Sequence, residues 1–171
     1  MKKMTINLNH MFSGALAFCS NMYPCTIKMT VLGHTYTFGS AEAAFQAGKC
    51  LNPDDVERFT RVKNGAEAKR LGRRVRLRAD WDTYRIAWMG QVLRAKFNQN
   101  EELAKKLQDT YPLQLVETNT WNDTFWGVCD GVGENHLGKL LMEIREEKRP
   151  MTEPKGELDL MQFGTPGERT F

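Results

Sequence analysis

The stretch TIKMTVLGHTYTFGSAEAAFQAGK, residues 26–49, predicts a β-hairpin that leads directly into a helix. Ser40 offers its side-chain oxygen as the N-cap of that helix, which we expect over residues 41–51. Apolar side chains alternate with polar ones on both sides of a turn at Gly33-His34, as one buried face of a hairpin requires: they are Ile27, Met29, Val31, Tyr36 and Phe38.

Helical patterns predominate after this stretch. The clearest lies over residues 80–97, where aromatic and aliphatic side chains recur at three- and four-residue steps. The other predicted elements are a helix beginning at Asn52-Pro53, a helix capped by Asn100 over residues 101–108, a short strand over residues 113–117 and a last core helix from about Asn135. We therefore predict a single compact α+β domain over residues 1–149, mainly helical with a small antiparallel β-sheet. A peripheral C-terminal tail, rich in proline and glycine, follows over residues 150–171.

Composition narrows the class of protein. The chain has 171 residues, of which 41% are hydrophobic and 26% charged, and this suits one globular domain and argues against general disorder. A net charge of +3 tolerates a polyanionic partner without requiring one. None of the four cysteines lies in a Cys-x-x-Cys pair, no residue spacing predicts a metal site, and no apolar run reaches transmembrane length. We expect a cytoplasmic protein with reduced thiols, without a metal and without a membrane segment.

Glu42 is the first candidate for a functional residue. It lies in the opening turn of the predicted helix, just after a strand, between small alanine neighbours. An acid at this position is commonly there only to complement the helix dipole. The alternative is a carboxylate at a strand-to-helix junction, where the small neighbours leave room for a ligand.

Asp123 is the second candidate, in the stretch WNDTFWG of residues 121–127. Asn-Asp is ordinary turn chemistry, and the aromatic residues around it are equally compatible with a core. A planar indole such as that of Trp126 beside a carboxylate also suits the binding of a base or a sugar face.

A glycine-rich turn, GVGENHLGK, follows over residues 131–139. Its spacing matches neither the Rossmann pattern nor a P-loop. Backbone N–H groups in such a turn before a helix can hold a phosphate, and Gly133 and Lys139 are our candidates for this. The equally good alternative is a plain turn in which Asn135 caps the helix.

The run KRLGRRVRLR, residues 69–78, carries six cations and no acid. Such a run is usually a solvated face. Its density also allows contact with a polyanion, for which the candidates are Arg73, Arg74 and Arg76.

Five stretches, in this order, resemble the NADAR family, also called YbiA-like. They are FCSNMYP (18–24), SAEAAFQAGK (40–49), RADWDTYRIAWMGQVLRAKFNQN (78–100), LVETNTWNDTFWG (115–127) and GENHLGKLLMEIR (133–145). The resemblance covers residues 12–147. The chain departs from the family pattern at Ala43, where histidine is frequent, and at Met22, where phenylalanine is usual.

The resemblance implies a compact, mainly helical α+β fold with no metal or cofactor, and hydrolysis of the N-glycosidic bond between ribose C1 and a nitrogen. Family members have been linked to ribosylaminopyrimidine phosphates of the riboflavin pathway and to removal of ADP-ribose from guanine in nucleic acid. The basic run favours the second substrate. Glu42, matched to the central glutamate of the family, is then the carboxylate that stabilises positive charge on the ribose, and Asp123 is the second catalytic carboxylate. The residues we expect to bind substrate are Ser20, Asn21, Tyr23, Lys49, Trp126, Gly127, Gly133, Asn135 and Lys139.

Two other functions remain open from the sequence. One is a non-catalytic module that binds ADP-ribose or NAD in the same pocket. The other is a nucleic-acid-binding accessory protein that acts through residues 69–78, and salt-dependent DNA binding with an empty pocket would favour it.

Overall fold

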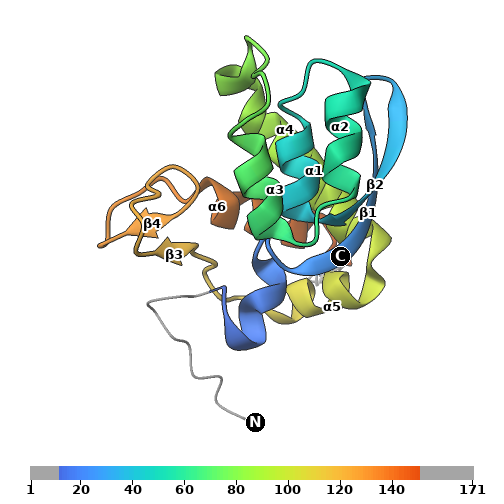
Figure 1. The fold of residues 1–171 in the computed structure, drawn as a ribbon. Coiled ribbons are helices and arrows are strands. Elements are labelled where there is room, and N and C mark those ends of the chain that lie inside the picture. Colours follow the sequence, from blue (N-terminus) through green and yellow to red (C-terminus); the bar gives the residue numbers. More distant parts are fainter. Residues whose placement is uncertain (1–11, 151–171) are drawn as a thin grey trace, which may run out of the picture.

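The predicted hairpin is present and organises the rest of the fold (Figure 1). The structure is a computed structural model that describes residues 12–150. Ile27 and Phe38 lie opposite each other in the antiparallel pair, and both are buried. The turn lies one residue earlier than predicted, at Leu32-Gly33, where both residues have the positive φ that a tight hairpin turn favours. The two strands are β1 (Pro24–Val31) and β2 (His34–Ser40).

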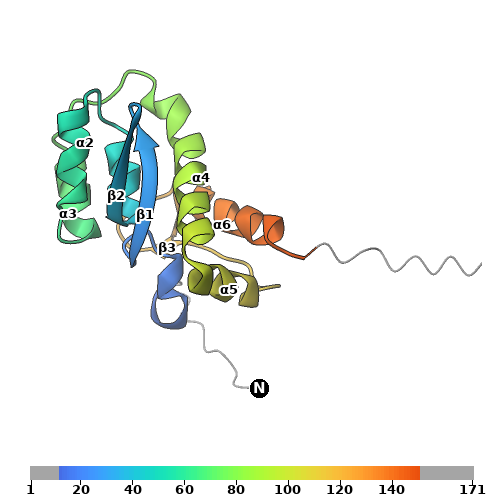
Figure 2. The same ribbon diagram turned by 90° about the vertical axis from the view of Figure 1, so that its right-hand side faces the viewer.

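Helices cover the hairpin and contain about half of the described residues. They are the 3-10 helix η1 (Gly14–Cys19), α1 (Ala41–Ala47), α2 (Pro53–Thr60), α3 (Gly65–Gly72), α4 (Trp81–Gln99), α5 (Glu101–Asp109) and α6 (His136–Glu147). Figure 2 shows the hairpin in front of α1, with α2 and α3 on one side and α4 on the other. The α+β fold predicted from the sequence is confirmed. Within the described residues, no helix combines the length and the apolar character needed to span a bilayer.

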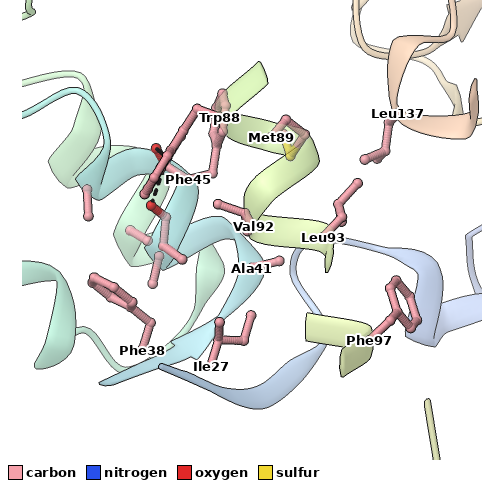
Figure 3. Close-up of a cluster of buried hydrophobic side chains, with 14 of the residues drawn as sticks. Ile27, Phe38, Ala41, Phe45, Trp88, Met89, Val92, Leu93, Phe97 and Leu137 are labelled. Atoms are coloured by element: carbon pink, nitrogen blue, oxygen red, sulfur yellow. Dashed lines mark hydrogen bonds between the residues drawn. The ribbon is translucent and has the colours of Figure 1, made fainter. Parts of the chain in front are cut away.

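Helix α1 is the centre of the domain. It follows β2 without a loop because the Ser40 hydroxyl accepts a hydrogen bond from the backbone N–H of Ala43 at 3.1 Å, which confirms the predicted N-cap. All of its residues are buried, and it contacts both strands as well as α2, α3 and α4. In Figure 3 the hairpin side chain Ile27 and the α4 side chain Val92 both lie near Ala41. The indole N–H of Trp88 donates to the backbone oxygens of residues 44 and 45, each at 3.2 Å, and so joins α4 to α1.

Two local predictions are wrong for related reasons. Residues 113–117 do not form a strand, because the side chain of Asn135 binds this segment instead: its amide donates to the Leu115 oxygen at 3.0 Å and its oxygen accepts from the Glu117 N–H at 3.0 Å. Asn100 does not cap α5 with its side chain, which donates to the backbone oxygens of Thr26 and Lys96. Both asparagines therefore satisfy backbone groups of distant segments. A two-residue parallel pair, β3 (Thr118–Asn119) and β4 (Val128–Cys129), follows the 113–117 segment.

Candidate active site

A cavity of about 350 Å³ lies where α1, α3 and α4 meet the loops on either side of β3. Its lining combines three carboxyl groups with three basic groups, and aromatic rings form much of the remaining wall. The acidic residues are Glu42, Glu117 and Asp123. The basic residues are Lys49, Lys69 and Arg85, and the aromatic ones are Phe45, Trp81, Trp121 and Trp126. The two carboxylates proposed from the sequence, 81 residues apart in the chain, thus share one cavity.

Glu42 is 7% exposed, in the first turn of α1. Its carboxylate accepts a hydrogen bond from the Gln46 side chain at 2.7 Å, and its backbone N–H donates to the backbone oxygen of Asn21 at 2.9 Å. Burial raises the pKa of the Glu42 carboxyl, while the Gln46 hydrogen bond and the charges of Lys69 and Lys49 act in the opposite direction. The dipole at the N-terminus of a helix favours the anion, but burial is the larger effect at this position.

Lys49 is one of two lysines whose positive charge acts on this carboxyl. Burial lowers the pKa of its ammonium group, and the charge of Glu42 partly offsets that effect. The ammonium nitrogen lies 5.6 Å from the centre of the Trp81 ring, a distance at which a cation is attracted to an indole face. Lys69 of α3 contributes a second cation to the same cavity.

Asp123 has a double role. Its Oδ1 atom accepts hydrogen bonds from the backbone N–H groups of Phe125 at 3.2 Å and Trp126 at 2.9 Å, which is the turn chemistry considered above. The Asn119 side chain holds the backbone of Asp123 on both sides, donating to its oxygen at 2.8 Å and accepting from its N–H at 3.0 Å. The Asp123 carboxylate also lines the cavity, so the same loop forms the turn and part of the cavity wall.

Glu117 is a cavity residue that the sequence analysis missed. Its Oε2 atom is buried and has no hydrogen-bond partner in the part of the chain that the structure describes. Burial, reinforced by the nearby charge of Asp123 and opposed by Lys69, raises the pKa of the Glu117 carboxyl to about 7. Glu117 lies within the family-like stretch of residues 115–127, but no periodicity or spacing rule used above singles it out.

Comparison with known proteins identifies the family to which the chain belongs. The NADAR domain matches residues 11–149, which is most of the chain. The protein belongs to the NADAR family. Its relatives include the N-glycosidase YbiA of Shigella boydii, 42% identical over 114 residues, a match that covers 65% of this chain and 71% of that protein. A riboflavin biosynthesis protein of Vibrio vulnificus is 40% identical over 136 residues, covering 76% of this chain and 35% of that protein.

The fold of this NADAR domain also resembles a solved structure. The NMR structure of the Escherichia coli protein YbiA matches with a TM-score of 0.68 and 36% identity, over 82% of this chain and 88% of that one.

Several residues expected to bind substrate in this NADAR site do line the cavity. They are Ser20, Asn21, Lys49 and Trp126. Trp126 lies edge-on to Phe45, with ring centres 5.4 Å apart, and so belongs partly to the core. Trp121, which was not singled out for stacking, is 56% exposed and also lines the cavity.

The glycine-rich turn has a different place from the one expected. Gly127, Gly133, Asn135 and Lys139 are not among the residues that line the cavity, nor is Tyr23. The backbone N–H groups of residues 134–137 donate to the backbone oxygens of residues 124–127, so they are not available to a phosphate in this arrangement. The turn serves to hold the WNDTFWG loop against the start of α6.

The basic run is divided between two hollows: Lys69 lines the cavity, whereas Arg70 and Arg74 line a second hollow. A groove of about 360 Å³ lies between α2 and α3, and we call it the arginine groove because its lining includes Arg58, Arg61, Arg70 and Arg74. Arg58 and Arg61 form ion pairs with acids of α2, whereas Arg70 and Arg74 have no acidic partner within residues 12–150. Arg73 and Arg76 are exposed outside both hollows.

Proposed function

We propose that this NADAR protein is an N-glycosidase that hydrolyses the bond between ribose C1 and a nitrogen atom of a ribosyl-nucleotide conjugate. The observation that carries the proposal is the cavity in which Glu42 and Asp123 face one space beside tryptophan rings and lysine side chains. The names of the relatives, N-glycosidase among them, agree with this chemistry.

Breaking a C–N glycosidic bond creates positive charge on the ribose ring. A carboxylate in a cavity shielded from water stabilises that charge more strongly than one in open solvent. Glu42 is suited to this role because it is buried, and because the Gln46 amide holds one of its oxygens in a fixed orientation. The same carboxylate can accept a proton from the attacking water.

The rest of the lining suits the other parts of such a substrate. Asp123 is placed to accept hydrogen bonds from ribose hydroxyl groups, and Ser20 and Asn21 offer further polar contacts. Lys49 and Lys69 supply positive charge for a phosphate, and the exposed ring of Trp121 offers a face for a base.

We further propose that the base is guanine carrying ADP-ribose in a nucleic acid, rather than a free ribosylaminopyrimidine phosphate. The support comes from α3, on which Lys69 lines the cavity and the next residue, Arg70, lines the arginine groove. A strand whose modified base entered the cavity would have its phosphates near these unpaired arginines. The four cysteines are free thiols, which is compatible with a reducing compartment such as the cytoplasm.

The decisive experiment offers the purified protein both substrates and measures the freed base. ADP-ribosyl-guanine DNA and a ribosylaminopyrimidine phosphate are compared, with Glu42→Gln as the test variant. Glutamine can still accept the Gln46 hydrogen bond, so we expect retained binding and a loss of turnover of about 100-fold or more. The matched control is Glu102→Gln, at an exposed position of α5.

The outcomes separate the candidates. Unchanged turnover in Glu42→Gln would refute the role of this residue. Binding of ADP-ribose by the native protein without any release of base would instead favour the non-catalytic module. Cleavage of the ribosylaminopyrimidine phosphate alone would reject the nucleic-acid substrate but keep the N-glycosidase.

A further inference from the structure

The backbone of Glu117 is held in place more firmly than its loop position suggests. Its N–H donates to the Asn135 side chain at 3.0 Å and its oxygen accepts from the Val128 N–H at 2.8 Å. Gly127 packs so closely that a Cβ atom there would lie 2.1 Å from the Glu117 oxygen. A side chain carried by such a backbone is presented to the cavity in a defined position.

The carboxyl of Glu117 has one oxygen atom that the fold leaves without a partner. Its Oε2 atom is buried with no hydrogen-bond partner among residues 12–150. Buried polar atoms without partners are rare in native proteins, because each costs the free energy of removing it from water. The other two carboxyls of the cavity differ in this respect, since Glu42 binds Gln46 and Asp123 binds two backbone N–H groups.

The surroundings of Glu117 favour a protonated carboxyl near neutral pH. Asp123 is the anion that acts on it, Lys69 is the opposing cation, and together with burial they leave its pKa at about 7. Glu42, Lys49 and Arg85 are the other charged groups of the same cavity. A carboxyl that keeps its proton near neutral pH can donate it to a leaving group, which is what a general acid must do.

We propose that Glu117 is the general acid of the reaction, which donates the proton on Oε2 to the nitrogen of the departing base. This inference rests on the proposed N-glycosidase function. The C1–N bond breaks and its electron pair stays on the nitrogen, which receives the Glu117 proton. Water forms the new C1–O bond and gives one proton to Glu42. That proton returns through solvent to Glu117, so that one water is consumed for each bond cleaved.

The test compares Glu117→Gln with Glu102→Gln on the substrate that the native protein cleaves. We expect the test variant to keep its fold, by circular dichroism, and its substrate KM to within about threefold, and to lose kcat by roughly 100-fold or more. The native kcat should fall as pH rises through about 7, because the acid is then deprotonated, and this limb should be absent from the variant. A full kcat in Glu117→Gln, or an unchanged alkaline limb, would overturn the inference while the N-glycosidase function stands.

Two further measurements cover the remaining outcomes. Glu117→Ala with added imidazole should regain part of its activity, because the protonated form of imidazole is present near pH 7 and a small acid can enter the space left by the side chain; no gain at any pH would count against the role. Carbon-13 NMR of glutamate carboxyls should show one signal that titrates near pH 7 and disappears in Glu117→Gln, and its absence would overturn the inference without any assay of turnover. A native protein inert on both substrates would reject the proposed function itself, and with it this role.

Discussion

The buried ammonium group of Lys96 allows a quantitative test of how the chain beside the cavity is held. Its side chain is 0% exposed, and its nitrogen donates to the backbone oxygens of Phe18 at 2.6 Å and Ser20 at 3.0 Å. Ser20 lines the cavity, so this lysine ties the core to one edge of the site. Burial lowers the pKa of Lys96 from its ordinary value of 10.5 to about 8, and the Cys25 and Cys19 thiols oppose this effect only in part.

This pKa predicts how stability depends on pH. Between pH 8 and 10.5 the unfolded chain still binds the Lys96 proton while the folded chain has released it, so the free energy of unfolding rises with pH in this window. Each pH unit is worth about 1.4 kcal/mol. The native protein should therefore gain on the order of 2 to 3 kcal/mol from this residue between pH 8 and pH 10.

The comparison is between the native protein and Lys96→Met, by urea unfolding with a thiol reductant at several pH values. Between pH 8 and pH 10, the free energy of unfolding of the native protein should rise relative to that of Lys96→Met by on the order of 2 to 3 kcal/mol. Lys105→Met, an exposed lysine of α5, is the control and should show no such change. A pH-independent difference for Lys96→Met would mean that the buried nitrogen keeps its proton throughout, and would refute the reasoning.

Three other outcomes follow from the site. Gly127→Ala should lower the free energy of unfolding by about 1 to 3 kcal/mol and reduce turnover, because its Cβ would meet the Glu117 oxygen; Gly39→Ala, whose Cβ would meet nothing within 4 Å, should be close to neutral. Trp121→Ala should raise KM by roughly 10-fold with little change in kcat, as expected for a lost stacking face, and an unchanged KM would exclude that role. Neutral substitutions of Arg73, Arg74 and Arg76 should weaken cleavage of a DNA substrate and reduce the salt dependence of that cleavage, but leave cleavage of a mononucleoside substrate unchanged. Equal losses on both substrates would argue against DNA contact.

The parts of the fold that could be predicted are those set by neighbours in the sequence. Alternation over residues 27–38 and the hydroxyl of Ser40 act within a few residues, and both were confirmed. The strand expected over residues 113–117 failed because its backbone groups bind Asn135, 18 and 20 residues further along the chain. No local pattern contains that information. Helix α3 is a similar case, because the sequence analysis did not predict it. Its sequence is mostly charged, and no apolar periodicity marks the face that packs on α1.

The residues of the site also differ in whether local sequence could identify them. Glu42 and Asp123 stand in distinctive surroundings, between alanines or beside indoles, and a reader of the sequence can suspect them. Glu117 stands among ordinary residues, and its character depends on burial, on the charge of Asp123 and on the absence of a hydrogen-bond partner, all of which are created by folding. Gly127 and Asn135, which the sequence made prominent, contact Glu117 and do not line the cavity themselves. Motifs in this protein therefore mark the residues that position the site as strongly as those that face the cavity, and only the fold separates the two.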